Sequence, residues 1–216
     1  MTEDRKLQES VLAELSWEPS LIAAHIGVTA RDGVVTLTGH VANFAEKRAA
    51  ETAAGRVKGV AAVAEEIEVR LSDDRRRGDE EIATAALELL AWDVSVPRDA
   101  IKVKVEKGWI TLTGQVDRHF QRDAAEQNVR RLFGVLGVSN ETTIKPTPNL
   151  TGISEDITQA LHRSWLFDPN TISVTSDGGK VRLAGSVRSP SERAQALATA
   201  WAAAGTTAVV NDIIVV

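Results

Sequence analysis

Apolar residues recur at every fourth position in three separate segments of the chain. An interval of four residues keeps side chains on one side of a helix, so each segment is predicted to be an amphipathic helix. After each helix comes a run in which apolar and polar residues alternate, which is typical of a strand with one buried face. The helical sets are Leu7/Val11/Leu15, Ile82/Ala86/Leu90 and Ile157/Leu161/Trp165, and the alternating sets are Ile26/Val28, Ile101/Val103/Val105 and Ile172/Val174.

The most regular part of the sequence is a second strand-like run bounded by glycines. It occupies residues 33–39, 108–114 and 179–185, at intervals of 75 and 71 residues. A short glycine-containing turn joins it to the preceding strand, which predicts a hairpin. A second helix with small inner residues is predicted from about Asn43, Arg118 and Ser189, and a third strand from Val63 to Val69, Val138 to Ile144 and Val209 to Val215.

The order helix, strand, strand, helix, strand is therefore repeated three times. We predict an α+β protein of three tandem modules, each a small three-stranded mixed sheet covered by two helices on one face. The charged segment 72–78 and the proline-containing segment 145–149 have the composition of linkers. The predicted modules occupy residues 1–71, 78–146 and 150–216.

Composition narrows the range of functions. The formal net charge is −5 and no module is basic, which argues against nucleic acid, because clustered Lys and Arg supply most of the affinity for phosphates. The absence of cysteine excludes disulfides and thiolate metal sites. No apolar run approaches the ~20 residues of a membrane span. No secretory leader is recognisable, so we expect a cytoplasmic protein, or a periplasmic one if a leader has been removed.

Two recurring runs resemble the BON domain. They are the sequence Gly-Val-Val-Thr-Leu-Thr-Gly at residues 33–39 and the closing run that the second copy carries at residues 134–140. The resemblance implies the α-β-β-α-β fold. It also implies a bacterial protein that is osmotically induced, transport-associated or linked to envelope stress, with phospholipid as its ligand. The sequence departs from the family in lacking a secretion signal and a LysM-like segment, and in carrying Glu65 where the other copies have Asn140 and Asn211.

Residues that carry enzyme chemistry do not form a recognisable set. The histidines His25, His40, His119 and His162 occupy non-equivalent positions in the three copies, whereas a zinc site needs three or four convergent ligands. The carboxylates form no motif of a general acid/base pair, and nucleophile-elbow and phosphate-loop motifs are absent. We therefore expect a protein that is not an enzyme and has neither a cofactor nor a metal.

Aromatic residues near the end of the first helix are the first candidates for a contact site. Trp17, Trp92 and Phe167 are equivalent, and each precedes an acidic residue. They are interpreted either as a plug that closes the helix against the core or as an anchor at a lipid headgroup interface. Trp109 is expected on the sheet face away from the helices, because Lys180 is its equivalent, and there it would contact another copy, another subunit or a ligand.

Basic residues recur on the second helix at Lys47, Arg122 and Arg193. They are interpreted either as contacts for anionic headgroups or as a solvated helix face that neighbouring acids offset.

The leading functional hypothesis is a non-enzymatic, stress-associated binding protein that engages anionic phospholipid or a membrane-associated partner. One alternative is a structural scaffold that binds protein partners or self-associates. Another is an ion sensor of the potassium type, since a family relative that carries a LysM module binds that ion.

Overall fold

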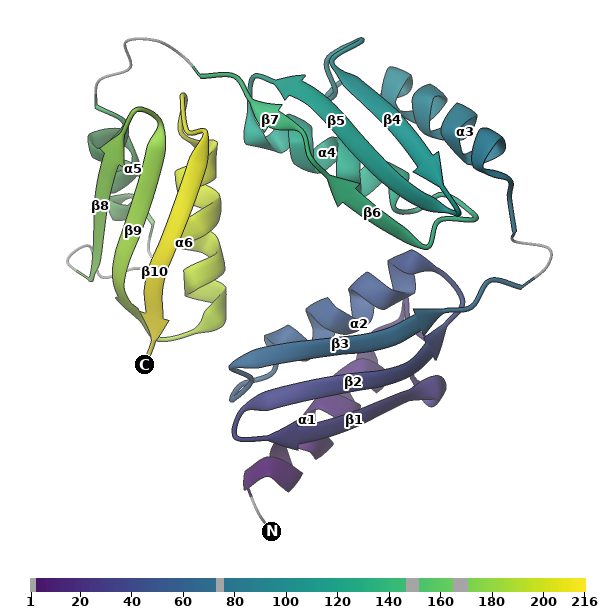
Figure 1. Cartoon of the computed structure of the whole chain (residues 1–216). Helices are drawn as coiled ribbons and strands as arrows, with labels where there is room; N and C mark the ends of the chain where they lie inside the picture. Colours follow the sequence, from purple (N-terminus) through teal and green to yellow (C-terminus); the bar gives the residue numbers. More distant parts are fainter. Residues whose placement is uncertain (1–2, 73–75, 147–151, 165–170) are drawn as a thin grey trace. The chain divides into compact units, whose positions relative to one another are not determined.

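The computed structural model describes residues 3–72, 76–146, 152–164 and 171–216 (Figure 1). Each predicted copy forms its own small sheet, and in each copy both helices lie on the same face of that sheet. The predicted α+β fold of three modules is confirmed. In the first module the elements are α1 (Glu3–Trp17), η1 (Ala23–His25), β1 (Ile26–Arg31), β2 (Val34–Val41), α2 (Phe44–Arg56) and β3 (Ala62–Val69).

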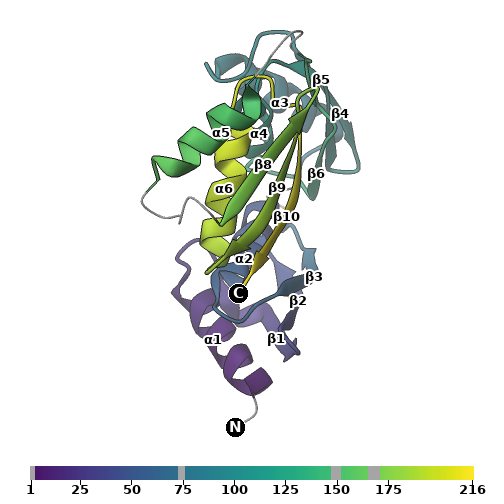
Figure 2. The ribbon, with the colours of Figure 1, turned by 90° about the vertical axis from the view of Figure 1, so that its left-hand side faces the viewer.

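The second and third modules repeat this order. The second contains α3 (Asp79–Trp92), β4 (Ile101–Glu106), β5 (Trp109–Val116), α4 (His119–Val129), β6 (Gly137–Asn140) and β7 (Thr143–Ile144). The third contains α5 (Ile153–His162), β8 (Ile172–Asp177), β9 (Lys180–Val187), α6 (Pro190–Ala202) and β10 (Ala208–Val215). Figure 2 shows α5 and α6 on one side of the β8–β9–β10 sheet.

Each sheet is mixed because its third strand arrives after a helix. In the first module β1 pairs with β2 antiparallel, as a hairpin must, whereas β2 pairs with β3 in parallel. The third module has the same order, with β9 in the centre. In the second module both β6 and β7 lie beside β5, so the third strand is interrupted at residues 141 and 142.

Burial follows the predicted periodicities. The first helix buries Val11 and Leu15, the central strand buries Val35 and Leu37, and these side chains belong to one core cluster. The small inner face predicted for the second helix is also observed, since Ala50 and the neighbouring alanines are fully buried. Equivalent buried residues in the other modules are Ile82, Ala86, Leu90, Ile110, Leu112, Ala125 and Val129, and Ile157, Leu161, Val181, Leu183, Ala196 and Ala200.

The glycine that closes the repeated run is required by the backbone. Gly39 has φ 110°, and a Cβ atom there would lie 2.0 Å from the carbonyl oxygen of His25. Gly114 and Gly185 have φ 136° and 133°, and their added Cβ atoms would approach backbone oxygens to 2.1 and 1.9 Å. A side chain would be strained and obstructed at all three positions, which explains why this residue returns in every copy.

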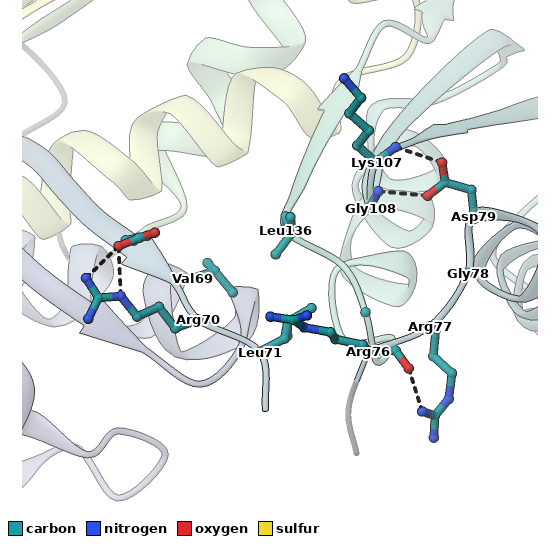
Figure 3. Close-up of a pocket in the computed structure, with 12 residues that line it drawn as sticks. Val69, Arg70, Leu71, Arg76, Arg77, Gly78, Asp79, Lys107, Gly108 and Leu136 are labelled. Atoms are coloured by element: carbon teal, nitrogen blue, oxygen red, sulfur yellow. Dashed lines mark hydrogen bonds and ion pairs between the residues drawn. The ribbon is translucent and has the colours of Figure 1, made fainter. Parts of the chain in front are cut away.

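Side chains close the ends of the helices. Asn43 accepts a hydrogen bond from the backbone N–H of Glu46 at 2.9 Å, and Ser189 accepts one from Glu192 at 3.2 Å. These contacts are the N-terminal half of a capping box, so the predicted starts of α2 and α6 are confirmed. At the start of α3, the Asp79 carboxylate accepts from the backbone N–H groups of Lys107 and Gly108 at 2.7 and 2.8 Å (Figure 3).

Candidate functional site

The aromatic side chains at the end of the first helix point away from the core. Trp17 is 83% exposed and Trp92 is 86% exposed. Each follows the last buried leucine of its helix, Leu15 or Leu90, by two residues, and two residues turn an α-helix through about 200°. The tryptophan must therefore lie opposite the buried stripe, and the interpretation as a core plug is wrong for both. Phe167, the third member of the set, lies outside the described residues.

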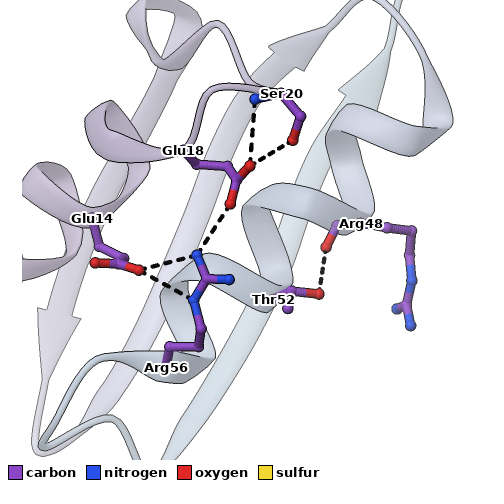
Figure 4. Close-up of polar contacts among 6 residues, drawn as sticks. All are labelled: Glu14, Glu18, Ser20, Arg48, Thr52 and Arg56. Carbon is purple, nitrogen blue, oxygen red and sulfur yellow. Dashed lines mark hydrogen bonds and ion pairs between the residues drawn. The ribbon is translucent and has the colours of Figure 1, made fainter.

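Side-chain contacts connect the end of the first helix, next to Trp17, to the following loop and to α2. The Glu18 carboxylate accepts hydrogen bonds from the hydroxyl and the backbone N–H of Ser20 at 2.7 and 3.3 Å. Arg56, at the end of α2, lies 3.1 Å from Glu18 and 3.0 Å from Glu14 (Figure 4). The hydrogen bonds from Ser20 and Arg56 lower the pKa of Glu18, and the two carboxylates raise the pKa of Arg56.

Further exposed apolar side chains lie close in sequence to both tryptophans. Val94 is fully exposed two residues after Trp92, and Ile22 is 61% exposed in the loop after Trp17. The loop after Trp92 has a hydrogen bond like that between Ser20 and Glu18 in the first module. Asp93 accepts a hydrogen bond from the backbone N–H of Ser95 at 2.7 Å. The two helix ends thus each present large apolar side chains to solvent.

The basic residues of the second helix were interpreted as headgroup contacts or as a solvated face. Both interpretations are wrong for Lys47 and Arg122. The Lys47 ammonium lies 2.9 Å from the Glu65 carboxylate and donates to the carbonyl oxygen of Ile67 at 2.8 Å. Arg122 donates to the carbonyl oxygen of Asn140 at 2.9 Å. Both side chains are partly buried and join the helix to the third strand, so they are neither headgroup contacts nor a solvated face. Arg193 is exposed.

Glu65 stands where the other two modules have asparagine, and it makes the same local hydrogen bond as they do. Glu65 accepts the backbone N–H of Ile67 through a side-chain oxygen at 2.5 Å. Asn140 and Asn211 accept the N–H two residues further on in the same way, at 3.2 and 3.1 Å. A carboxylate and an amide both supply that acceptor oxygen, which accounts for their exchange between copies.

Trp109 lies on the sheet face away from the helices, as expected. It is 49% exposed, and its indole Nε1 donates to the hydroxyl of Ser139 at 2.9 Å. The ring covers Gly137 on the neighbouring strand, where an added Cβ would lie 2.3 Å from the ring. This contact within the module accounts for much of the buried indole surface, and the sequence alone gave no sign of it.

The described residues contain no group of three or more His, Cys, Asp or Glu residues placed to hold a metal ion. No helix among them is long and apolar enough to cross a membrane.

Comparison with known proteins establishes the family. The model of the BON domain matches three times, at residues 3–70, 78–146 and 149–216. The chain belongs to the BON family. Its BON modules are 31% identical over 151 residues to the osmotically-inducible protein Y of Escherichia coli K12, an alignment that covers 66% of this chain and 73% of the relative. Family and relative point to a non-catalytic protein.

Solved structures of one other protein also align with the BON chain. Two structures of CdsD, a structural protein of the type III secretion system of Chlamydia trachomatis, align with it at 18% and 16% identity and a TM-score of 0.26. The first alignment covers 98% of this chain and 92% of the other, and the second covers 100% of both. Superposition at that score carries no argument about function.

Proposed function

We propose that this BON protein is a non-catalytic, stress-related binding protein that attaches to the surface of phospholipid membranes through its first-helix ends. The observation that carries the proposal is the pair Trp17 and Trp92, which occupy the same position in two modules and are 83% and 86% exposed. The osmotically-inducible relative supports the association with stress.

The physical basis is the amphipathic indole ring. A tryptophan presents a large apolar body and one N–H donor, so it is favoured where hydrocarbon meets headgroups. Removal of about 100 Å² of apolar ring surface from water contributes about 2.5 kcal/mol at about 25 cal/mol per Å². Each of the two rings contributes this amount when it inserts.

Charge contributes less to this attachment than the rings. Lys47 and Arg122 are engaged within their modules, which leaves Arg193 as the exposed member of the basic set. The net charge of −5 also disfavours approach to an anionic surface. We therefore expect high salt to leave vesicle binding nearly unchanged, whereas binding driven by exposed Lys and Arg would fall steeply.

Co-sedimentation with vesicles tests the proposal. Vesicles of phosphatidylcholine, with and without phosphatidylglycerol, are mixed with the chain at low and high salt. Trp17→Ala and Trp92→Ala should each weaken binding about 70-fold, as about 2.5 kcal/mol requires, and the double variant should bind little. Phe133→Ala, which removes another exposed aromatic ring, is the matched control and should bind normally. Absence of binding at every composition, or normal binding of the double variant, would overturn the proposal.

A second candidate function is a scaffold that pairs with another chain through β10. This strand lies at the edge of its sheet, and its residue Ile214 is 61% exposed. The equivalent strand β3 instead exposes Glu66 and Glu68, charges of the kind that discourage pairing at an edge. If two chains pair through β10, light scattering should report a dimer for the wild-type chain. The variant Ile214→Lys should be a monomer. A wild-type chain that is monomeric at all concentrations would exclude self-association through β10.

A further inference from the structure

Two histidines of the first module lie side by side. The ring centroids of His25 and His40 are 4.7 Å apart and the ring planes are inclined by 25°. His25 ends η1, directly before β1, and His40 lies on β2. The register of the hairpin pairs Ile26 with Gly39, so the two histidines occupy the next position outward on the neighbouring strands. His25 is exposed and His40 is half-buried, so solvent reaches the pair.

The histidine pair occurs in the first module and has no equivalent in the other two modules. Every module has the close approach between the glycine that closes the repeated run and the residue before the first strand, as at Gly39 and His25. The second module has Ala100 and Gln115 at the positions equivalent to the two histidines, and the third module has Thr171 and Ser186. The fold is therefore formed without imidazoles at these positions, and their presence in the first module calls for another explanation.

We propose that His25 and His40 form a two-imidazole site for a divalent transition-metal ion of the class that prefers nitrogen ligands, such as Ni²⁺, Cu²⁺ or Zn²⁺. Two imidazoles bind one ion at about 2.0–2.1 Å each, which places the ligating nitrogens about 3.3 Å apart in a tetrahedral arrangement. The centroids of the two rings are 4.7 Å apart, so both imidazoles lie within reach of one ion placed between their nitrogens.

The surroundings of the pair provide one carboxylate and access to water. Glu68 on β3 is the register partner of His40, and its exposed side chain pairs with Arg70 at 2.8 Å. The described residues contain no three-ligand group already in place, so the two imidazoles define the site and water completes the coordination. Such a site is open, unlike the closed four-ligand sites that hold structural zinc.

Calorimetric titration of the full chain with Ni²⁺ and with Zn²⁺ tests this site, with Mg²⁺ as the hard cation that imidazoles should not bind. We expect one ion per chain at neutral pH, and loss of binding at acidic pH, because a ligating imidazole nitrogen must be unprotonated. NMR spectra of the imidazole groups should show that the resonances of His25 and His40 move or broaden together.

Variants designed from the second module separate metal binding from folding. His25→Ala and His40→Gln introduce the residues that the second module carries at these positions, so the first module should stay folded. Each should weaken Ni²⁺ binding about tenfold or more, since one of two protein ligands is lost. His162→Ala, on the third module, is the control and should bind normally. A wild-type chain that does not bind Ni²⁺ or Zn²⁺, or a double variant that still binds, would overturn the proposal.

Discussion

Replacement of Gly39, the glycine that closes the repeated run of the first module, should remove much of that module's stability. Gly39→Ala places a Cβ atom 2.0 Å from the carbonyl oxygen of His25, at a backbone with φ 110°. Strained backbone of this kind costs about 1–3 kcal/mol, and overpacking costs about 1–3 kcal/mol more. The expected loss is therefore about 4 kcal/mol, against about 4–10 kcal/mol for the unfolding of a domain of this size.

A second glycine of the same module provides the matched control. Gly55 lies within α2, where an added Cβ meets no atom within 4 Å. Alanine is the better helix former, so Gly55→Ala should stabilise the module by about 1 kcal/mol. The same chemical change at two positions should thus have opposite effects, and the difference depends only on backbone conformation and space.

Native-state hydrogen exchange on the full chain measures both effects. Exchange protection of the strand amides in residues 26–41 and 62–69 reports the stability of the first module, and residues 172–187 of the third module are the internal reference. Gly39→Ala should lower protection in the first module alone. A loss below about 1 kcal/mol for Gly39→Ala, or equal losses for both variants, would refute the role assigned to Gly39.

Three further predictions concern side chains in the first two modules. The contacts of Glu18 in the folded state lower its pKa from the ordinary value of 4.5, so they stabilise the first module. This stabilisation is fully present above pH 4.5 and is lost as the pH falls through the lowered pKa of Glu18. NMR titration should find Glu18 ionising below 4.5, and titration at or above 4.5 contradicts this. Lys47→Ala should destabilise the first module by about 1–3 kcal/mol, measured by hydrogen exchange, because Glu65 loses its cation. Vesicle binding of this variant should not change. Trp109→Ala should destabilise the second module by about 2 kcal/mol through loss of the half-buried ring, and a neutral result would place that ring's role outside the module.

Several local features of this protein follow from short-range rules and were predictable. The exposed position of Trp17 is one of them, although the sequence analysis left it open. The helical turn between Leu15 and Trp17 decides the matter, and the same count applies to Leu90 and Trp92.

Contacts between elements that are distant in sequence could not be predicted in the same way. Lys47 was seen as one of three basic residues on a helix, but its partner Glu65 lies on a strand 18 residues later. That contact depends on how the helix crosses the sheet and on the strand register. Likewise, no spacing rule relates His25 to His40, which lie side by side because the hairpin register pairs their neighbours Ile26 and Gly39.

The sequence by itself determined the repeat, the order of elements in each module, and the residues that are buried, because helical and strand periodicities are properties of neighbouring residues along the chain. Tertiary structure decided which polar residues are engaged and which surfaces remain open. Lys47 and Arg122 are held within their modules, whereas Trp17 and Trp92 are left to solvent. The physical reason is that a side chain's partners are set by distances in space, which the packing of helix on sheet establishes only once the chain has folded.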